Sequence, residues 1–280
     1  MKNILFTISL LCLVCMQSQA SEVRLKMPNG LVANAAYIKG DSNKPTVFLL
    51  HGFLQTHHFS TINRLFESLS GEGFSVFSPT TTLGIPNRKK SLACEALHDH
   101  TMKNDQDEIA VWIKWLEDNG HKNIVMMGHS QGSTSILSYL VKHKPTTVSK
   151  FIAVSILEVN VSRNETENNR FNKVLNNKLA ENARTPFTSQ LSFCNKYLGT
   201  PKSFQSYQTW TTAKILKETR RLKIPIRLIM GGSDNRIRKD WIEKLKATKK
   251  PLTVIEGANH FMDGFNEFDL LEVVIKELEK

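Results

Sequence analysis

The sequence predicts an α/β fold with a mostly parallel sheet, because short apolar runs recur along the chain and helical periodicity follows several of them. This alternation differs from an antiparallel meander, in which tight turns join successive strands. The runs expected to form strands are residues 46–50, 74–78, 124–127, 151–156, 226–230 and 252–255.

Two amphipathic helices are predicted between these strands. Each helix places its apolar side chains at spacings of three and four residues, which puts them on one face. The two sets are Ile109, Trp112, Ile113 and Leu116, and then Ile136, Leu137, Leu140 and Val141.

Residues 158–214 interrupt the alternation of strands and helices. The segment has no strong strand pattern and is rich in Asn, Lys and Arg, with a helix expected at about 171–179. We therefore predict a cap inserted into one domain that spans residues 21–280. The alternative is a long surface excursion without function.

The first 20 residues are expected to form a secretory signal peptide. Lys2 gives a positive start, residues 4–16 are uncharged and too short to span a bilayer, and Ser-Gln-Ala at 18–20 suits a signal peptidase. We expect cleavage after Ala20 and export to a periplasm or to the exterior. A retained membrane anchor is the alternative.

The formal net charge is +11 at pH 7. This charge favours contact with anionic surfaces or substrates, including lipid headgroups of a membrane. The competing interpretation is that the lysines serve solubility, since they lie along the whole chain and form no block. No nucleic-acid motif accompanies the charge, so nucleic acid is not a predicted partner.

Two cysteines, Cys94 and Cys194, remain once the leader is removed. Exported compartments are oxidising, which makes this pair a candidate for one disulfide. Two buried free thiols are the alternative, because free cysteine is common in protein cores.

The sharpest functional motif is Gly-x-Ser-x-Gly at residues 128–132, with Ser130 at its centre. It follows the predicted strand 124–127 and precedes a predicted helix. At such a place a sharp turn lifts the serine hydroxyl above the sheet edge, and the glycines let neighbouring backbone approach closely. The motif predicts Ser130 as a nucleophile.

A serine hydroxyl needs a base to take its proton. Only His143 and His260 follow Ser130 among the nine histidines, and His143 lies over ~15 Å away along the same predicted helix. His260, in the loop after the last predicted strand, is therefore the predicted base.

The imidazole in turn needs a carboxylate to fix its tautomer. Asp234 follows the strand 226–230 through a Gly-Gly-Ser turn and is the predicted acid. Glu158, directly after the preceding strand, is the reserve candidate, and Asp240 is expected on a solvated helix.

Backbone N–H groups usually stabilise the oxyanion in acyl transfer. We predict Phe53, in the His-Gly-Phe turn after the first strong strand, and Gln131, directly after Ser130, as the two donors. Phe53, Leu54 and Gln55 are expected to line the acyl pocket, with His129 as a further substrate-binding residue. The alternative for the His-Gly pair is a simple turn.

Residues 98–100, His-Asp-His, have the side chains of a metal site. Alternating residues at a helix start point apart, so surface or capping roles are preferred and no metal is predicted.

The motifs at 51–53, 128–132, 231–234 and 257–260 together resemble the α/β-hydrolase superfamily over about residues 44–275. The resemblance implies an eight-stranded, mostly parallel sheet flanked by helices, with a cap inserted after the sixth strand. It also implies the triad of Ser130, Asp234 and His260, and it implies no metal or organic cofactor. Within the superfamily the chain is most similar to small esterases and lipases.

We therefore expect an exported serine hydrolase that cleaves carboxylic esters of small molecules or lipids through an acyl-enzyme intermediate. The alternatives are a lipase or acyltransferase at a membrane surface, a thioesterase, and a hydrolase-like binding protein without turnover. The acyl-chain length and the oligomeric state are not predicted.

Overall fold

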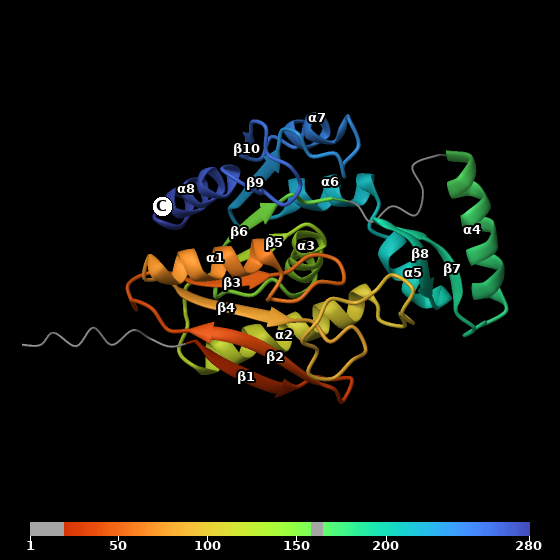
Figure 1. Ribbon diagram of the computed structural model, residues 1–280, viewed down its shortest axis with the longest axis horizontal. Helices are drawn as coiled ribbons and strands as arrows, with labels where there is room; N and C mark the ends of the chain where they lie inside the picture. Colours follow the sequence, from red (N-terminus) through yellow and green to blue (C-terminus); the bar gives the residue numbers. More distant parts are fainter. Residues whose placement is uncertain (1–19, 158–164) are drawn as a thin grey trace, which may run out of the picture.

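The structure is a computed structural model that describes residues 20–157 and 165–280. It is built on an eight-stranded sheet in the order β1-β2-β4-β3-β5-β6-β9-β10 (Figure 1). Strand β2 pairs antiparallel with β1 and β4, and the other pairs are parallel. The strands are β1 (Ser21–Lys26), β2 (Val32–Ile38), β3 (Thr46–Leu50), β4 (Ser75–Thr80), β5 (Ile124–His129), β6 (Val148–Val154), β9 (Ile226–Gly231) and β10 (Leu252–Ile255). The mostly parallel sheet expected from the sequence is confirmed.

Helices cover both faces of the sheet. They are α1 (Ser60–Gly71), α2 (Met102–Asp118), α3 (Gln131–His143), α6 (Thr212–Arg221), α7 (Trp241–Lys246) and α8 (Asn266–Leu278). The buried strand β3 shows how the faces divide: Phe48 and Leu50 join the cluster that includes apolar residues of α2 and α3, whereas Val47 and Leu49 join the one that includes those of α1 and α8. Successive side chains of a strand point to opposite faces, so a central strand of this kind is apolar throughout.

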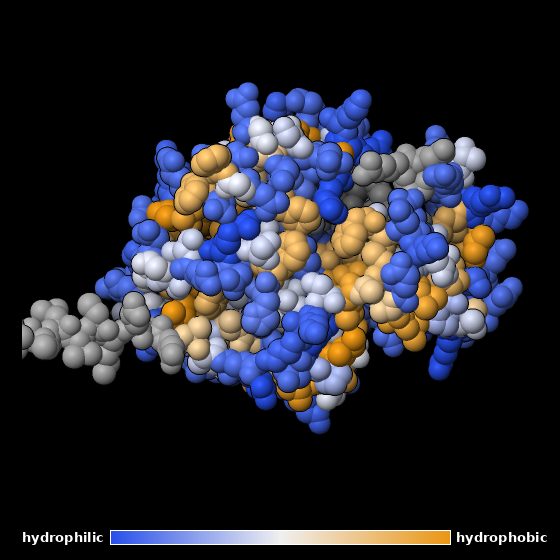
Figure 2. All heavy atoms as spheres, in the orientation of Figure 1, coloured by the Kyte–Doolittle hydropathy of each residue, from blue (hydrophilic) through white to orange (hydrophobic). Residues whose placement is uncertain are grey.

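Between β6 and β9 the described chain forms α4 (Glu165–Ala180), β7 (Phe187–Leu191), β8 (Cys194–Gly199) and α5 (Pro201–Gln208) before α6. The antiparallel hairpin of β7 and β8 is a finding that the sequence did not predict. Phe204 and Tyr207 of α5 belong to the same apolar cluster as β3, so this segment packs onto the main core. On the face shown in Figure 2, hydrophobic residues gather around α5 and its junction with the sheet.

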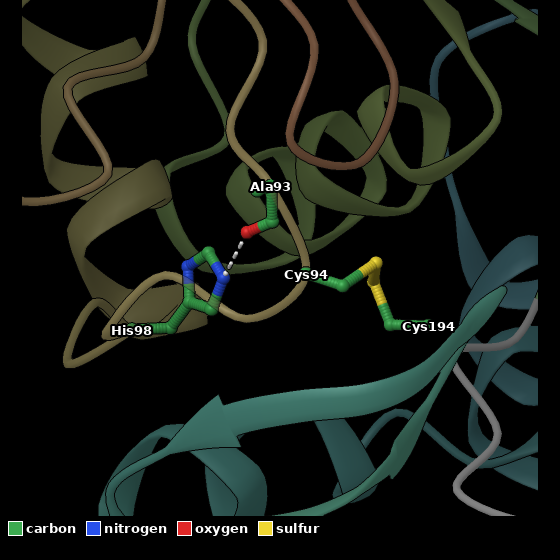
Figure 3. The surroundings of a disulfide bond; sticks show 4 residues. All are labelled: Ala93, Cys94, His98 and Cys194. Atoms are coloured by element: carbon green, nitrogen blue, oxygen red, sulfur yellow. Dashed lines mark hydrogen bonds between the residues drawn. A yellow bond between two sulfur atoms is a disulfide. The ribbon is translucent and has the colours of Figure 1, made fainter.

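A disulfide joins Cys94, in the segment before α2, to Cys194 at the start of β8 (Figure 3). Their Cα atoms are 5.5 Å apart, a usual separation for a bridge. Backbone hydrogen bonds continue the contact, because Leu198 N–H donates to the Cys94 carbonyl and His98 N–H donates to the Leu198 carbonyl. The hairpin is therefore tied both covalently and by backbone pairing to the segment that precedes α2.

Removing this bridge with Cys94→Ser and Cys194→Ser is expected to lower the free energy of unfolding. The bridge closes a loop of 100 residues, for which chain entropy gives up to ~4.7 kcal/mol. Urea unfolding of the double variant and the wild type measures the difference. Non-reducing peptide mapping of protein exported into an oxidising compartment is the companion test, and two alkylatable thiols there would contradict the pairing.

No helix within residues 20–157 and 165–280 combines the length and the apolar character that a membrane span needs.

Candidate active site

Ser130 lies on a strained turn between β5 and α3. Its backbone has φ +56° and ψ −125°, a region that residues other than glycine rarely occupy. Sterics explain the flanking glycines: a Cβ at Gly128 would lie 2.6 Å from backbone atoms of the next turn, and one at Gly132 would lie 2.4 Å from the His51 carbonyl. The Gly-x-Ser-x-Gly pattern thus permits the close packing of β5, α3 and the loop after β3 on which this turn depends.

Three side chains from separate loops form one chain of hydrogen bonds at the carboxyl edge of the sheet. The Ser130 Oγ lies 2.8 Å from His260 Nε2, and His260 Nδ1 lies 2.7 Å from Asp234 Oδ2. Because the Asp234 carboxylate accepts the proton of Nδ1, Nε2 has a free lone pair that accepts the Ser130 hydroxyl. All three residues are buried, Ser130 being 6% exposed and His260 3%. The structure therefore brings together the three residues that the sequence singled out.

The loop bearing His260 is held by two further donors. His129 Nε2 lies 2.9 Å from the His260 carbonyl oxygen, and the Ser155 hydroxyl donates to the same oxygen at 2.9 Å. Burial, reinforced by the His260 ring, lowers the pKa of His129 to about 3, so this imidazole is neutral. The His129 side chain, expected from the sequence to bind substrate, is fully buried and supports the histidine loop. Ser155 was not foreseen.

The Asp234 carboxylate is positioned by its own turn and by close packing of β9 on the histidine loop. Its Oδ1 accepts the Arg236 N–H at 2.8 Å, which leaves Oδ2 directed at His260. A Cβ at Gly231 would lie 2.4 Å from the Ala258 carbonyl, so glycine is required where β9 meets this loop.

The two other acids considered from the sequence do not take this position in the described structure. Asp240 precedes α7 at the surface and pairs with Lys244, as expected of a solvated residue. Glu158 lies outside the described residues.

The loop after β3 packs directly beside the serine. A Cβ at Gly52 would lie 3.3 Å from the Ser130 Cβ. The Gln55 side chain folds back to accept the Gly52 N–H at 3.0 Å, which shapes the turn that carries Phe53. Gln131 is the first residue of α3, so its N–H has no acceptor within the helix. These are the backbone positions predicted for the oxyanion donors.

Arg88 stabilises this loop through hydrogen bonds to backbone carbonyl groups. Its buried guanidinium donates to the carbonyls of Leu54, Gln55, Thr81 and Lys90. Five N–H donors in a rigid plane allow one side chain to join several backbone segments. Arg88 was missed by sequence reasoning, because nothing local distinguishes it from a surface arginine.

Comparison with known proteins gives the family. The sequence pattern of the "alpha/beta hydrolase fold" family matches residues 45–193, more than half of the chain. The chain belongs to the α/β-hydrolase fold family. No curated protein matches the sequence.

Solved structures show the same fold. Est1E from Butyrivibrio proteoclasticus is 15% identical, with a TM-score of 0.63 over 92% of this chain and 99% of that one. The Pyrococcus furiosus esterase Pf2001 is 17% identical, with a TM-score of 0.63 over 94% and 90%. The thioesterase domain from the curacin biosynthetic pathway is 14% identical, with a TM-score of 0.62 over 94% and 100%. At these identities the likeness shows the α/β-hydrolase fold alone.

A cavity of about 20 Å³ in this α/β-hydrolase lies beneath the loop after β3, which is room for about one water molecule. Phe53 and Leu54, two of the residues expected to line an acyl pocket, line it together with Gln131. Gln55 does not, because its side chain turns back onto Gly52. Ser135, Asp105 and Tyr207 form part of the remaining wall.

Helix α2 carries two buried carboxyl groups, Asp105 and Glu108, of which Asp105 lines this cavity. Asp105 accepts a hydrogen bond from the Ser135 hydroxyl at 3.0 Å, and Glu108 accepts the Thr82 N–H at 2.8 Å. Burial, with a smaller contribution from Glu108, raises the pKa of Asp105 to about 8. Burial likewise raises the pKa of Glu108 to about 7. Asp105 is therefore protonated in the folded protein at neutral pH.

Asp105→Asn is expected to change the pH dependence of stability. Between the ordinary pKa of 3.8 and the folded value of about 8, folded Asp105 keeps a proton that the unfolded chain releases, so the free energy of unfolding falls as pH rises. Asp105→Asn has no carboxyl group to titrate, so its free energy of unfolding does not fall with pH for this reason. Between about pH 5 and about pH 7, the free energy of unfolding of Asp105→Asn should therefore rise by at least ~1 kcal/mol relative to that of the wild type. Urea unfolding at several pH values measures this gain, and parallel profiles would contradict it.

His98 and His100, considered from the sequence as surface or capping residues, are buried in the structure. The surface assignment is therefore wrong. His98 Nε2 lies 3.1 Å from the Ala93 carbonyl oxygen, and His100 Nδ1 lies 2.7 Å from the Tyr207 hydroxyl (Figure 3 shows His98). They fill the interface between the segment before α2 and the cap elements β8 and α5. Within the part of the chain that is described, no three metal-ligand side chains cluster.

Proposed function

We propose that the protein is an exported serine hydrolase that cleaves carboxylic esters through an acyl-enzyme intermediate. The observation that carries the proposal is the hydrogen-bonded chain Ser130–His260–Asp234 on the strained turn of β5 and α3. A hydroxyl, an imidazole and a carboxylate at these distances are what acyl transfer requires of a nucleophile, a base and its orienting group.

In the proposed mechanism each of these residues has a defined part. His260 Nε2 takes the proton of Ser130 as the Oγ attacks the ester carbonyl, and the Asp234 carboxylate stabilises the imidazolium. The N–H groups of Phe53 and Gln131 stabilise the negative oxygen of the tetrahedral intermediate. His260 then passes the proton to the departing alcohol. Water, activated by the same imidazole, releases the acid from Ser130.

The cap favours a water-soluble ester over an interface-bound long-chain lipid. Helix α4 buries only Phe171 and Leu175 among its described side chains, and its exposed face is largely polar. A lid that binds lipid interfaces needs a large apolar face instead.

Export is supported by the disulfide and by the leader sequence. Cys94 and Cys194 are bonded, and bridges of this kind persist in oxidising compartments. We therefore place the working enzyme in a periplasm or outside the cell, after cleavage near Ala20.

A thioester is the second candidate substrate, and the fold likeness to the curacin thioesterase domain favours including it. Purified protein is assayed with 4-nitrophenyl esters of increasing acyl length and with matching thioesters, and Ser130→Ala serves as the blank. The proposal predicts the highest kcat/KM on short oxygen esters. Turnover of every ester no faster than the blank would refute it, and a clear preference for thioesters would reassign the enzyme to that class.

A further inference from the structure

Arg236 is an exposed cation held next to the buried triad. Its backbone N–H donates to the Asp234 carboxylate at 2.8 Å, so the proposed triad acid holds the Arg236 backbone in place. Its guanidinium carbon lies 4.8 Å from the centre of the Phe261 ring and 5.4 Å from that of Phe193. Contacts between a cation and aromatic faces at these distances are attractive and hold the guanidinium in place.

The two rings connect Arg236 to both halves of the proposed machinery. Phe261 directly follows His260, and the centres of these two rings are 5.2 Å apart. Phe193 lies at the tip of the β7–β8 hairpin, and its ring centre is 5.8 Å from that of Phe53. The guanidinium thus contacts one ring, Phe261, that packs on the proposed base, and a second ring, Phe193, that packs on the oxyanion loop.

The charge of Arg236 has no protein counterion within the described residues. Arg24, Arg64 and Arg227 each pair with an Asp or Glu carboxylate, whereas no ion pair joins Arg236 to a carboxylate in residues 20–157 or 165–280. An arginine presents a planar fork of donors that suits carboxylate and phosphate groups. Here two aromatic contacts orient that fork, and no carboxylate among the described residues pairs with it.

The position of Arg236 also indicates which part of an ester it meets. His260 delivers its proton to the alcohol oxygen, so the alcohol portion lies on the side of the His260–Phe261 loop. The acyl portion would then lie on the opposite side of Ser130, towards Phe53 and Gln131. Arg236, packed on Phe261, therefore faces the alcohol portion.

We propose that Arg236 determines substrate class by binding a negatively charged group, a carboxylate or phosphate, on the alcohol portion of the ester. This inference rests on the proposed function. A competing role is purely structural, in which Arg236 only clamps the hairpin tip to the histidine loop. A clamp affects charged and neutral esters equally, whereas a recognition residue affects the charged ester alone.

The test compares 4-acetoxybenzoate with its neutral methyl ester, methyl 4-acetoxybenzoate, at constant ionic strength. Both esters carry the same acyl group. For each ester we divide the kcat/KM of the variant by that of the wild type, so the intrinsic difference in reactivity between the two esters cancels. Arg236→Gln is expected to lower kcat/KM for 4-acetoxybenzoate about tenfold, the range of a charge-assisted contact at a partly exposed site. The neutral ester should change less than about twofold, since it makes no such contact.

Two further variants serve as controls. Lys239→Gln removes the same charge from an exposed residue of the same loop and should leave both esters within about twofold, which excludes a general effect of net charge. Arg236→Lys keeps the charge without the planar fork and should recover part of the preference.

The outcomes separate this inference from the proposed function. If Arg236→Gln lowers kcat/KM equally for both esters, or changes it for neither, the recognition role is overturned while ester hydrolysis stands. An equal drop in Lys239→Gln on the charged ester overturns it as well, because the effect would then be general electrostatics. No turnover of either ester by the wild type overturns the proposed function and this inference together.

Discussion

Replacing Ser130 with alanine is expected to lower kcat for a short-chain ester by roughly 10⁶-fold, the scale of losing the nucleophile from a triad. The loss is large because no other hydroxyl lies on the strained turn in contact with His260 Nε2 in the described structure. The fold should survive, since the substitution removes one oxygen and no apolar contact. Initial rates on 4-nitrophenyl acetate, with circular dichroism to check folding, measure both effects.

A matched control is Ser138→Ala, which removes a buried hydroxyl from α3, the helix that follows Ser130. The Ser138 Oγ donates to the Ser135 carbonyl and takes no part in the chain to His260. Its loss should change kcat less than about twofold, as for a substitution remote from the reacting groups. Near-normal activity of a folded Ser130→Ala protein would exclude Ser130 as the nucleophile.

Asp234→Asn is expected to cost turnover on the order of 10⁴-fold. The amide keeps the shape of the carboxylate, but its NH₂ group donates a hydrogen bond to His260 Nδ1. The imidazole then carries its proton on Nε2 and cannot accept the serine proton. Glu158→Gln should cost about tenfold or less if that residue only supports the cap. Both variants are assayed at one pH with a short-chain ester.

Asp240→Asn gives the matched control for this exchange. It removes the same charge at the surface before α7, away from His260, and should leave turnover within about twofold. A severe loss in Glu158→Gln beside a mild one in Asp234→Asn would transfer the role of triad acid to Glu158 and leave Ser130 and His260 in place.

The parallel part of the sheet could be predicted because most of its strands, β3, β4 and β5 above all, are buried on both faces. Strands such as β3 are then apolar throughout, and runs of this kind stand out in a sequence. The edge strand β1 has only Val23 and Leu25 between charged residues, so its pattern carries little signal. Strand β7 has mixed polar residues and a turn at Ser192, and tertiary pairing with β8 and the bridge to Cys94 determines its conformation.

The reacting residues could be predicted because their chemistry limits the choice. Ser130 is marked by its glycines, and His260 is the one later histidine that does not lie on the helix directly after Ser130. The supporting residues carry no such mark. His129 and Ser155 act on a carbonyl more than 100 residues away along the chain, and Arg88 binds backbone oxygens that any residue provides. Such contacts follow from the packing of loops at the sheet edge, which local pattern does not encode.

The central claim is that the Ser130 hydroxyl is an activated nucleophile, and covalent labelling tests it most directly. The protein is incubated with a fluorophosphonate, digested, and mapped by mass spectrometry. We predict one adduct per chain, on the peptide that contains Ser130, absent in Ser130→Ala and formed much more slowly in Asp234→Asn. A folded protein that forms no adduct, or one that is labelled at another serine while Ser130 stays free, would contradict the account.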